Sequence, residues 1–256
     1  MLKKIIASSI GLLGLINVAF AEDNRSFYAQ VNAGISFPID LKISGIDPTF
    51  WDQAYEGYGA RFSNTPVVGI GLGYNFSNCL SVLISSDWRG IYHYAKYQTF
   101  TEATVINPIG HKTRLFDLRN INLMLNVMVN GSSFDNLHID FNNGAMLTPF
   151  VGIGLGVAQN ILSNFHSVVP QNPSVIRSYM ESKTAYSIAA QGMAGISWSI
   201  NKKIGLDTGY RFYYGGKFKT NTEVFDPLYT TSSSAPCPWE AKLLTNEVFI
   251  NLKYAF

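Results

Sequence analysis

The pentapeptide GIGLG occurs twice, in VVGIGLGYNF at 67–76 and in FVGIGLGVAQ at 150–159. A glycine-rich turn after an apolar strand can hold a phosphate, and the dinucleotide fingerprint is G-x-G-x-x-G at the start of a helix. Here the sixth positions are Tyr74 and Val157, and the YNFSN that follows the first copy is typical of a turn. The spacing therefore argues against a nucleotide site, and we expect no cofactor.

Histidine is the other residue type that could support catalysis or bind a metal in this chain. The four histidines show no H-x-x-x-H or comparable ligand spacing. We therefore expect no metal site and no enzymatic activity, with each ring solvated on a connection between strands. These residues are His93, His111, His138 and His166.

The first 21 residues have the form of a secretory signal peptide. Two lysines precede an apolar run from Ile5 to Val18, and Ala19-Phe20-Ala21 supplies small residues at the cleavage positions. The run is shorter than the roughly 20 residues that cross a bilayer as a helix. We expect cleavage after Ala21, which leaves one domain over 22–256; the alternative is an uncleaved anchor.

The remaining chain is apolar for a secreted protein and has no second long apolar run. Charged residues make up 14% of the sequence and aromatic residues another 14%, whereas soluble domains carry about 25% charged residues. The 19 Lys and Arg lose two with the leader and then balance the 17 Asp and Glu. A neutral chain lacks the basic face that nucleic acid requires. The composition favours a membrane β-barrel.

Eight segments alternate apolar and polar residues with the period of two that is typical of β-strands. In the first segment Phe27, Val31 and Ile35 share one face, and Gln30 and Asn32 share the other. The predicted strands are 26–37, 66–76, 79–91, about 115–129, 148–158, 185–200, 203–215 and 243–256.

Connections between these segments alternate in length. Short turns at one end and long loops at the other are typical of outer-membrane barrels. The short turns are 77–78 and 201–202, and the long joins are about 38–65, 92–114, 159–184 and 216–242.

Two connections carry further signals. Residues 92–114 alternate on both sides of INPIG, so we expect a hairpin that continues above the membrane. Residues 130–147 are too long for a periplasmic turn, and Asn-Gly pairs at 130–131 and 143–144 predict an extended turn or a small hairpin.

Alternation does not say which face is outside, because a soluble lipocalin-like barrel has its apolar face inward. Aromatic residues at both ends of the apolar faces favour lipid outside, at the two headgroup levels. Ten steps from Phe27 to Phe37 span roughly 25 Å at a tilt of about 40°, which is the height of the apolar band. The predicted girdles are Phe27, Phe76, Trp198 and Phe256 at the short-turn end, and Phe37, Trp88, Tyr186 and Tyr214 at the long-loop end.

The polar face suits the lumen of an eight-stranded barrel, which is just wide enough for side chains. We expect the ion pairs Asp207–Lys253 and Arg211–Glu247 inside it; the alternative is separately solvated charges in a wet lumen. We also expect the GIGLG glycines to leave space for inward residues. The predicted lumen charges are Asp87, Arg89, Asp207, Arg211, Glu247 and Lys253, and the bulky inward residues are Arg89, Arg211, Tyr213, Phe249, Met124 and Met128.

The last strand ends NEVFINLKYAF, with aromatic residues at Tyr254 and Phe256. Together with TPFVGIGLGVA and IGLDTGYRFYYGG it resembles strands five, seven and eight of bacterial outer-membrane proteins of the OmpA-transmembrane and opacity-protein (surface antigen) type. The resemblance covers 22–256. It implies an eight-stranded antiparallel up-and-down barrel in a Gram-negative outer membrane, without a peptidoglycan-binding domain. It also implies that the barrel-assembly machinery reads Tyr254 and Phe256.

This topology separates the two cysteines. Cys79 falls at the periplasmic end of the third strand and Cys237 in the last external loop. The height of a barrel far exceeds the ~7 Å limit between the Cα atoms of a disulfide. We expect no intramolecular disulfide.

Long loops on a rigid scaffold are where binding functions are usually placed. We therefore expect a structural and surface-interaction role, as an adhesin or surface antigen whose loops bind a host or environmental ligand. The alternative for the loops is that they only shield the barrel top. A narrow channel for small solutes or ions is the first alternative function, and an outer-membrane enzyme acting on lipid or peptide is the second.

Overall fold

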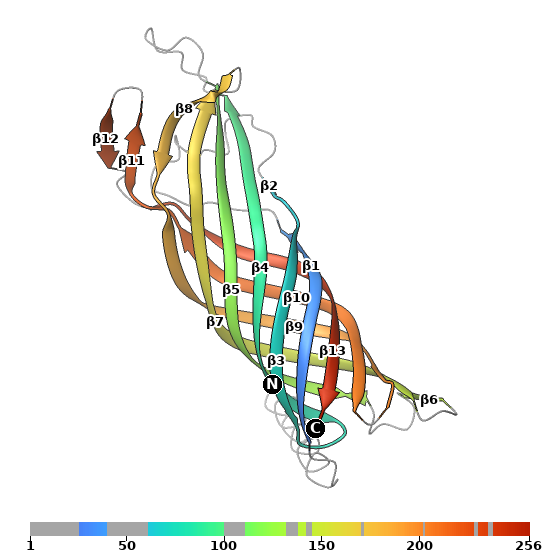
Figure 1. The fold of residues 1–256 in the computed structure, drawn as a ribbon. Helices are drawn as coiled ribbons and strands as arrows, with labels where there is room; N and C mark the ends of the chain where they lie inside the picture. Colours follow the sequence, from blue (N-terminus) through green and yellow to red (C-terminus); the bar gives the residue numbers. More distant parts are fainter. Residues whose placement is uncertain are drawn as a thin grey trace, which may run out of the picture.

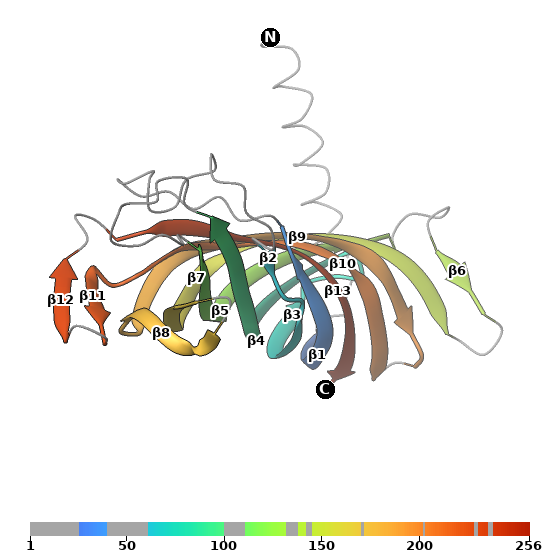
Figure 2. The same cartoon turned by 90° about the horizontal axis from the view of Figure 1, so that it is seen from above.

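The computed structural model describes residues 26–39, 61–99, 111–131, 138–141, 145–169, 172–201, 203–227, 230–234 and 238–256. Eight antiparallel strands close a ring in the order β1, β3, β4, β5, β7, β9, β10, β13 and back to β1 (Figures 1 and 2). Their bounds are β1 Ser26–Pro38, β3 Thr65–Asn75, β4 Leu80–Thr99, β5 His111–Asn130, β7 Met146–Val169, β9 Lys183–Ser199, β10 Ile204–Lys219 and β13 Glu240–Ala255. The predicted eight-stranded barrel is confirmed.

Five shorter strands are attached to the ring. β2 (Arg61–Phe62) pairs with β4, and β6 (Ile139–Asp140) pairs with the start of β7 to form the small hairpin expected within 130–147. β8 (Asn172–Met180) pairs with the upper part of β7 and carries β11 (Glu223–Asp226) and β12 (Thr231–Ser234) on its far edge. In Figure 1 these last three strands lie at the opposite end from the C-terminus.

The outward face of the ring is apolar, so the lipocalin-like alternative is wrong. Ile70 and Leu72 are each 66% exposed, and Ile153 is 72% exposed. The alternating inward residues are mostly polar, as Gln30, Asn32, Ser85, Asn122, Asn126 and Gln191 are all buried. This inside-out pattern is what lipid on the outside and a filled lumen require. Within the described residues, no helix is long and apolar enough to cross a membrane.

Three β-bulges reverse this pattern at the upper end of the ring. The bulges follow Arg89 in β4, Ser163 in β7 and Tyr214 in β10. Each inserts one extra residue, which shifts every later side chain to the other face of its strand. Asn164 (φ 53°) and Gly216 (φ 76°) adopt the left-handed conformation that two of the bulges need.

Above the bulges the barrel has a conventional apolar core. Tyr94, Phe116 and Phe165 are buried there, with Phe116 stacked on Tyr94 (ring centroids 4.4 Å) and on Phe165 (5.8 Å). His93, Ala95 and other polar or small residues take the outer face. Strands with an apolar inside and a polar outside suit water on the outer side. We call this part the extracellular extension; it comprises residues 92–99 of β4, 111–118 of β5 and 164–169 of β7, together with β8.

The extension changes two expected boundaries. The predicted hairpin at 92–114 is confirmed over its described residues, because β4 and β5 pair up to Thr99 and His111; its expected turn at 106–110 lies outside the described residues. The join expected at 159–184 is instead two paired strands, since β7 runs to Val169 and returns as β8. The sequence does not predict strands over 159–184 because the bulge at Asn164 interrupts the alternation of apolar and polar residues.

Candidate functional site

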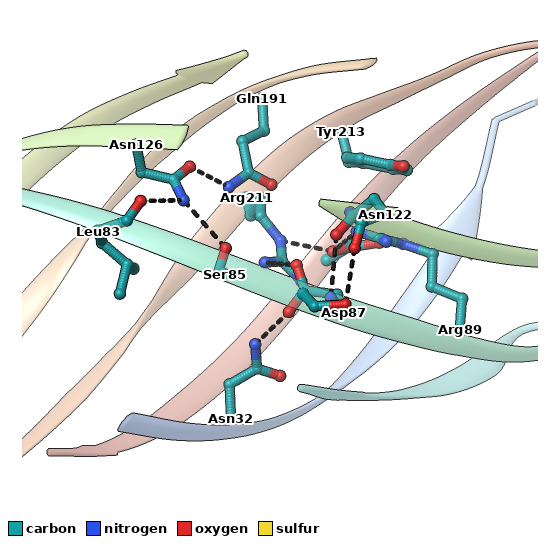
Figure 3. A network of polar contacts seen from close by, with 12 residues as sticks. Asn32, Leu83, Ser85, Asp87, Arg89, Asn122, Asn126, Gln191, Arg211 and Tyr213 are labelled. Atoms are coloured by element: carbon teal, nitrogen blue, oxygen red, sulfur yellow. Dashed lines mark hydrogen bonds and ion pairs between the residues drawn. The ribbon is translucent and has the colours of Figure 1, made fainter. Parts of the chain in front are cut away.

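Four charged side chains meet in the lumen at mid-height (Figure 3). Figure 3 labels three of them, Asp87, Arg89 and Arg211. Arg89 contacts Glu247 twice, with Nε 2.7 Å from Oε1 and Nη2 3.1 Å from Oε2. Arg211 donates from Nε to Glu247 Oε2 at 2.6 Å and from Nη1 to Asp87 Oδ2 at 3.0 Å. The side chains of Arg89, Glu247 and Asp87 are no more than 1% exposed. Two cations and two anions therefore neutralise one another away from solvent.

Uncharged groups add further hydrogen bonds to this cluster, although Arg211 Nη2 is buried without a hydrogen-bond partner among the described residues. Asn32 donates to Asp87, Thr245 donates to Glu247 Oε1 at 3.0 Å, and Arg89 Nη1 donates to Asn120 Oδ1 at 3.2 Å. The Arg89 guanidinium also lies 3.5 Å from the centre of the Tyr213 ring. Buried charges are stable only when paired and hydrogen-bonded in this way.

A second ion pair lies nearer the short-turn end. Lys253 Nζ is 2.6 Å from Asp207 Oδ2, and Lys253 also lies 5.4 Å from the Tyr28 ring centre. Both expected pairs, Asp207–Lys253 and Arg211–Glu247, are thus present, and Asp87 and Arg89 belong to the same cluster as Arg211. The alternative of separately solvated charges is wrong.

The hydrogen bonds that amide side chains form in the lumen were not predicted from the sequence. Asn120 Nδ2 donates to Asn160 Oδ1 at 2.7 Å, and Gln191 Nε2 donates to Asn126 Oδ1 at 2.5 Å. Asn126 in turn donates to Ser85 Oγ at 3.0 Å. The signal was their regular position on the polar face, which identifies inward residues but not their partners.

The glycines of both GIGLG copies lie where lumen side chains crowd the wall. A Cβ on Gly152 would meet Met193 at 3.0 Å and Met128 at 3.2 Å, and one on Gly71 would meet Leu83 at 2.7 Å. A Cβ on Gly156 would meet Met124 at 2.8 Å. The glycines therefore make room for Met124 and Met128 as expected.

The other bulky residues expected to use this space do not contact the glycines most closely. Arg89, Arg211, Tyr213 and Phe249 are buried but are not the nearest side chains to either GIGLG copy. The closest groups come from the strands directly paired with β3 and β7, because adjacent strands are much nearer than the opposite wall. Phe249 instead packs against Gly34 and Gly209.

The aromatic residues expected in the girdles lie at the two ends of the lipid-facing band. At the short-turn end Phe27, Trp198 and Phe256 are exposed and Phe76 is half-buried; at the other end Phe37, Trp88 and Tyr186 are exposed and Tyr214 is half-buried. Tyr254 and Phe256 close the C-terminal strand, with ring centroids 5.7 Å apart. Tyr74, which was not among the predicted girdle residues, packs against Phe27, with their ring centroids 4.7 Å apart.

Two of the histidines belong to a polar chain on the outer face of the extracellular extension. His93 Nδ1 lies 2.6 Å from Asp117 Oδ1, and Asn164 Nδ2 donates to Asp117 Oδ2 at 2.7 Å. His166 Nδ1 lies 2.7 Å from the Asn164 carbonyl oxygen. The expectation that these two rings are isolated is therefore wrong, although His93 is solvated as expected, with its side chain 66% exposed. The sequence does not show the bulges in β4 and β7 that set which residues of the neighbouring strands meet.

The other histidines are His111 and His138, and the cysteines are Cys79 and Cys237. His138 Nε2 is 3.3 Å from Asp140 Oδ2, and the ring of His111 is not among the described side chains. Among the described residues no three His, Cys, Asp or Glu form a metal-binding group. Cys79 is a buried free thiol, and Cys237 lies outside the described residues, so the expected absence of a disulfide stays a prediction.

A buried cation sits in the apolar core of the extension. Arg114 is 1% exposed, and its guanidinium lies 4.9 Å from the Trp239 ring centre. Burial lowers the pKa of Arg114 to about 9, and the neighbouring Tyr94 partly offsets this shift. Burial also raises the pKa of the Tyr94 phenol. The cation–aromatic contact with Trp239 offsets part of the cost of burying this charge.

Comparisons with known proteins agree with this architecture. Residues 82–228, more than half of the chain, match the family model described as Opacity family porin protein. Outer membrane protein PagN of Salmonella typhimurium is 23% identical over 245 residues, which cover 93% of each chain.

Two solved outer-membrane proteins are similar in structure. OprG from Pseudomonas aeruginosa has a TM-score of 0.49 and 11% identity, covering 90% of this chain and 95% of its own. Neisserial surface protein A has a TM-score of 0.40 and 14% identity, covering 90% and 97%.

Proposed function

The chain belongs to the Opacity family of porin proteins, and from this premise we propose that it acts at the surface of the bacterial outer membrane by binding rather than by transport. The role is that of an adhesin or surface antigen: the barrel anchors the protein, and the extracellular extension with its connections contacts a host or environmental surface.

One observation carries this proposal: three ring strands continue past the lipid-facing band and exchange an apolar exterior for a polar one. β4, β5 and β7 contain 20, 20 and 24 residues, whereas a membrane-spanning strand needs about 9–11. The additional length adds nothing to membrane anchoring. It holds a rigid, water-facing platform, and such platforms are where binding residues are placed.

The filled lumen supports binding over transport. The Arg89–Glu247–Arg211–Asp87 cluster occupies the barrel at mid-height, and an aromatic core fills the barrel above it. A permeating solute would have to displace buried ion pairs as well as packed rings.

An attachment assay tests the proposal. The full chain would be expressed in a non-adherent bacterium, and attachment to epithelial cells and to matrix-coated plates would be counted. The matched variant joins Ala95 to Leu115, which face each other in register, through a two-residue turn. We expect attachment to fall with this variant while the heat-dependent gel shift of the barrel persists. Attachment no greater than that of cells without the protein would contradict the proposal.

A role in catalysis would use His93 and Asp117, the one imidazole–carboxylate pair on the outer face described above. The proposal treats this pair as part of a binding surface. Incubation of purified protein with a peptide library and with phospholipid tests this assignment. If the unaltered protein turns over a peptide or phospholipid and Asp117→Asn abolishes this activity, the proposed function is catalysis and not binding.

A further inference from the structure

A groove of about 690 Å³ opens on the extracellular extension, where the β4–β5 and β7–β8 hairpins meet. The exposed or half-buried apolar residues of its lining are Leu115, Ile176 and Tyr179, while Tyr94, Phe116 and Phe165 lie beneath it, buried in the core of the extension. The polar residues of the lining include His93, Asp117, His166 and Glu181. Apolar walls with a few convergent polar groups are typical of ligand sites.

The hydrogen bonds of the two histidines fix which ring nitrogens are left for a ligand. A carboxylate and a backbone carbonyl only accept hydrogen bonds, so His93 Nδ1 donates to Asp117 and His166 Nδ1 donates to the Asn164 carbonyl. In a neutral imidazole the second nitrogen is then an acceptor. A ring in its neutral form therefore offers Nε2 as an acceptor.

The carboxylate between the rings is held in place by a strained residue. Asn164 donates to Asp117 Oδ2 at 2.7 Å from a backbone conformation with φ of 53°. Non-glycine residues adopt this conformation at a cost, and it persists where neighbouring structure enforces it. The bulge therefore orients the polar edge before any ligand arrives.

The charge of the groove is acidic. Asp117 and Glu181 are carboxylates, and none of the described residues that line the groove is a lysine or an arginine. Arg177 lies on β8 next to the lining residue Ile176, Lys183 follows the lining residue Ser182, and Arg119 is exposed two residues from Asp117 on β5, but none of the three belongs to the lining. Carboxylates favour ammonium and guanidinium donors, and the exposed ring of Tyr179 can pack on an apolar side chain or on the face of a cation.

We propose that this groove binds a cationic peptide segment in which lysine or arginine residues lie next to aromatic or aliphatic ones. The inference rests on the proposed surface-binding function and names the chemistry of its ligand. Basic groups pair with Glu181 and the His93–Asp117–His166 edge, and the apolar side chains pack on Leu115, Ile176 and Tyr179.

The test measures the fluorescence anisotropy of a labelled hexapeptide of alternating lysine and phenylalanine. The full chain is reconstituted in zwitterionic nanodiscs, and empty nanodiscs supply the background. A hexapeptide of alternating glutamate and phenylalanine has the same apolar content and the opposite charge. We expect the lysine peptide to bind at least about tenfold more tightly, because the groove presents acceptors and negative charge.

Two variants assign binding to the groove. Glu181→Gln and Asp117→Asn should each weaken binding about fivefold or more, the scale of a partly exposed charged contact. Glu223→Gln removes an exposed acid on β11 outside the groove and should bind like the unaltered protein. An unchanged affinity in both groove variants, or equal binding of the two peptides, would overturn the inference.

Other outcomes separate the ligand from the role. Self-association lost with Glu181→Gln would make a second copy the occupant and overturn the peptide assignment. Peptide binding without cell attachment would sink the proposed function and leave the groove assignment standing. If the protein does not bind the peptide and Glu181→Gln does not reduce cell attachment, the groove assignment fails and the proposed function stands.

Discussion

Arg89 on β4 and Glu247 on β13 lie 158 residues apart in sequence and form a two-point ion pair in the barrel interior. The same carboxylate also accepts from Arg211, so one acid neutralises two guanidinium groups. The pair spans the lumen between strands that are not paired with each other. It ties opposite parts of the wall together.

Replacing Glu247 by glutamine should strongly destabilise the barrel, because Arg89 and Arg211 would stay buried with their shared counter-charge removed. We expect a loss of about 3–5 kcal/mol in the free energy of unfolding. Urea titration in lipid vesicles, followed by the gel shift, measures it.

The matched control is Glu240→Gln, the same change on the same strand. It breaks the Lys217–Glu240 pair, whose side chains are 59% and 35% exposed. Water screens exposed pairs, so the cost should not exceed about 1 kcal/mol. Equal losses for the two variants would show that the lumen cluster contributes no special stability.

Glycine to alanine at Gly156 should impair folding. A Cβ there would overlap the backbone oxygen of Leu123 and approach Met124 Cα at 2.8 Å, and the paired backbone cannot easily move. We expect a destabilisation of about 1–3 kcal/mol from overpacking, with larger damage from Gly71→Trp or Gly154→Trp. The folded fraction after refolding into vesicles gives the measurement.

Gly192→Ala is the control for this series, because a Cβ at Gly192 meets nothing within 4 Å. Its stability should change by no more than about 0.5 kcal/mol. Normal folding of Gly154→Trp would refute the assignment of that glycine to the crowded inner face.

The purified protein should not conduct ions as a stable channel. Buried charges and packed aromatic rings occupy the lumen at two heights, and ions would have to displace both to pass. Planar-bilayer recording at high salt is the measurement, with a sixteen-stranded porin as the positive control. Stable opening steps that scale with salt would restore the channel as the leading function.

Asn164→Val should destabilise the extracellular extension, because a β-branched residue fits poorly at a φ of 53°. The expected cost is about 1–2 kcal/mol. Asn164→Gly relieves the backbone and loses only the Asp117 hydrogen bond, so its stability should stay within about 1 kcal/mol. Limited proteolysis of the extension compares them; equal protection of both variants would argue against strain at this position.

Local pattern was sufficient to predict the barrel. Successive side chains of a strand point to opposite faces, so alternation identifies both the strands and their two sides without knowledge of any partner. The period alone places Ile70 on an apolar face and Arg211 on a polar one, and the aromatic residues at both ends of the apolar faces then indicate that Ile70 faces lipid and Arg211 the lumen. The lengths of the connections then set the order of the strands and the ends at which they turn.

Contacts between distant strands could not be predicted in the same way. The meeting of Arg89 with Glu247 depends on the register around the whole ring, and the proximity of His93, Asp117 and His166 depends on bulges that insert one residue. A bulge moves every later side chain to the other face of its strand. Tyr94 is an even number of residues after the outward-facing Trp88, and it packs inside because the bulge lies between them. Sequence spacing contains no register between strands; hydrogen bonding and side-chain packing in the folded ring supply it.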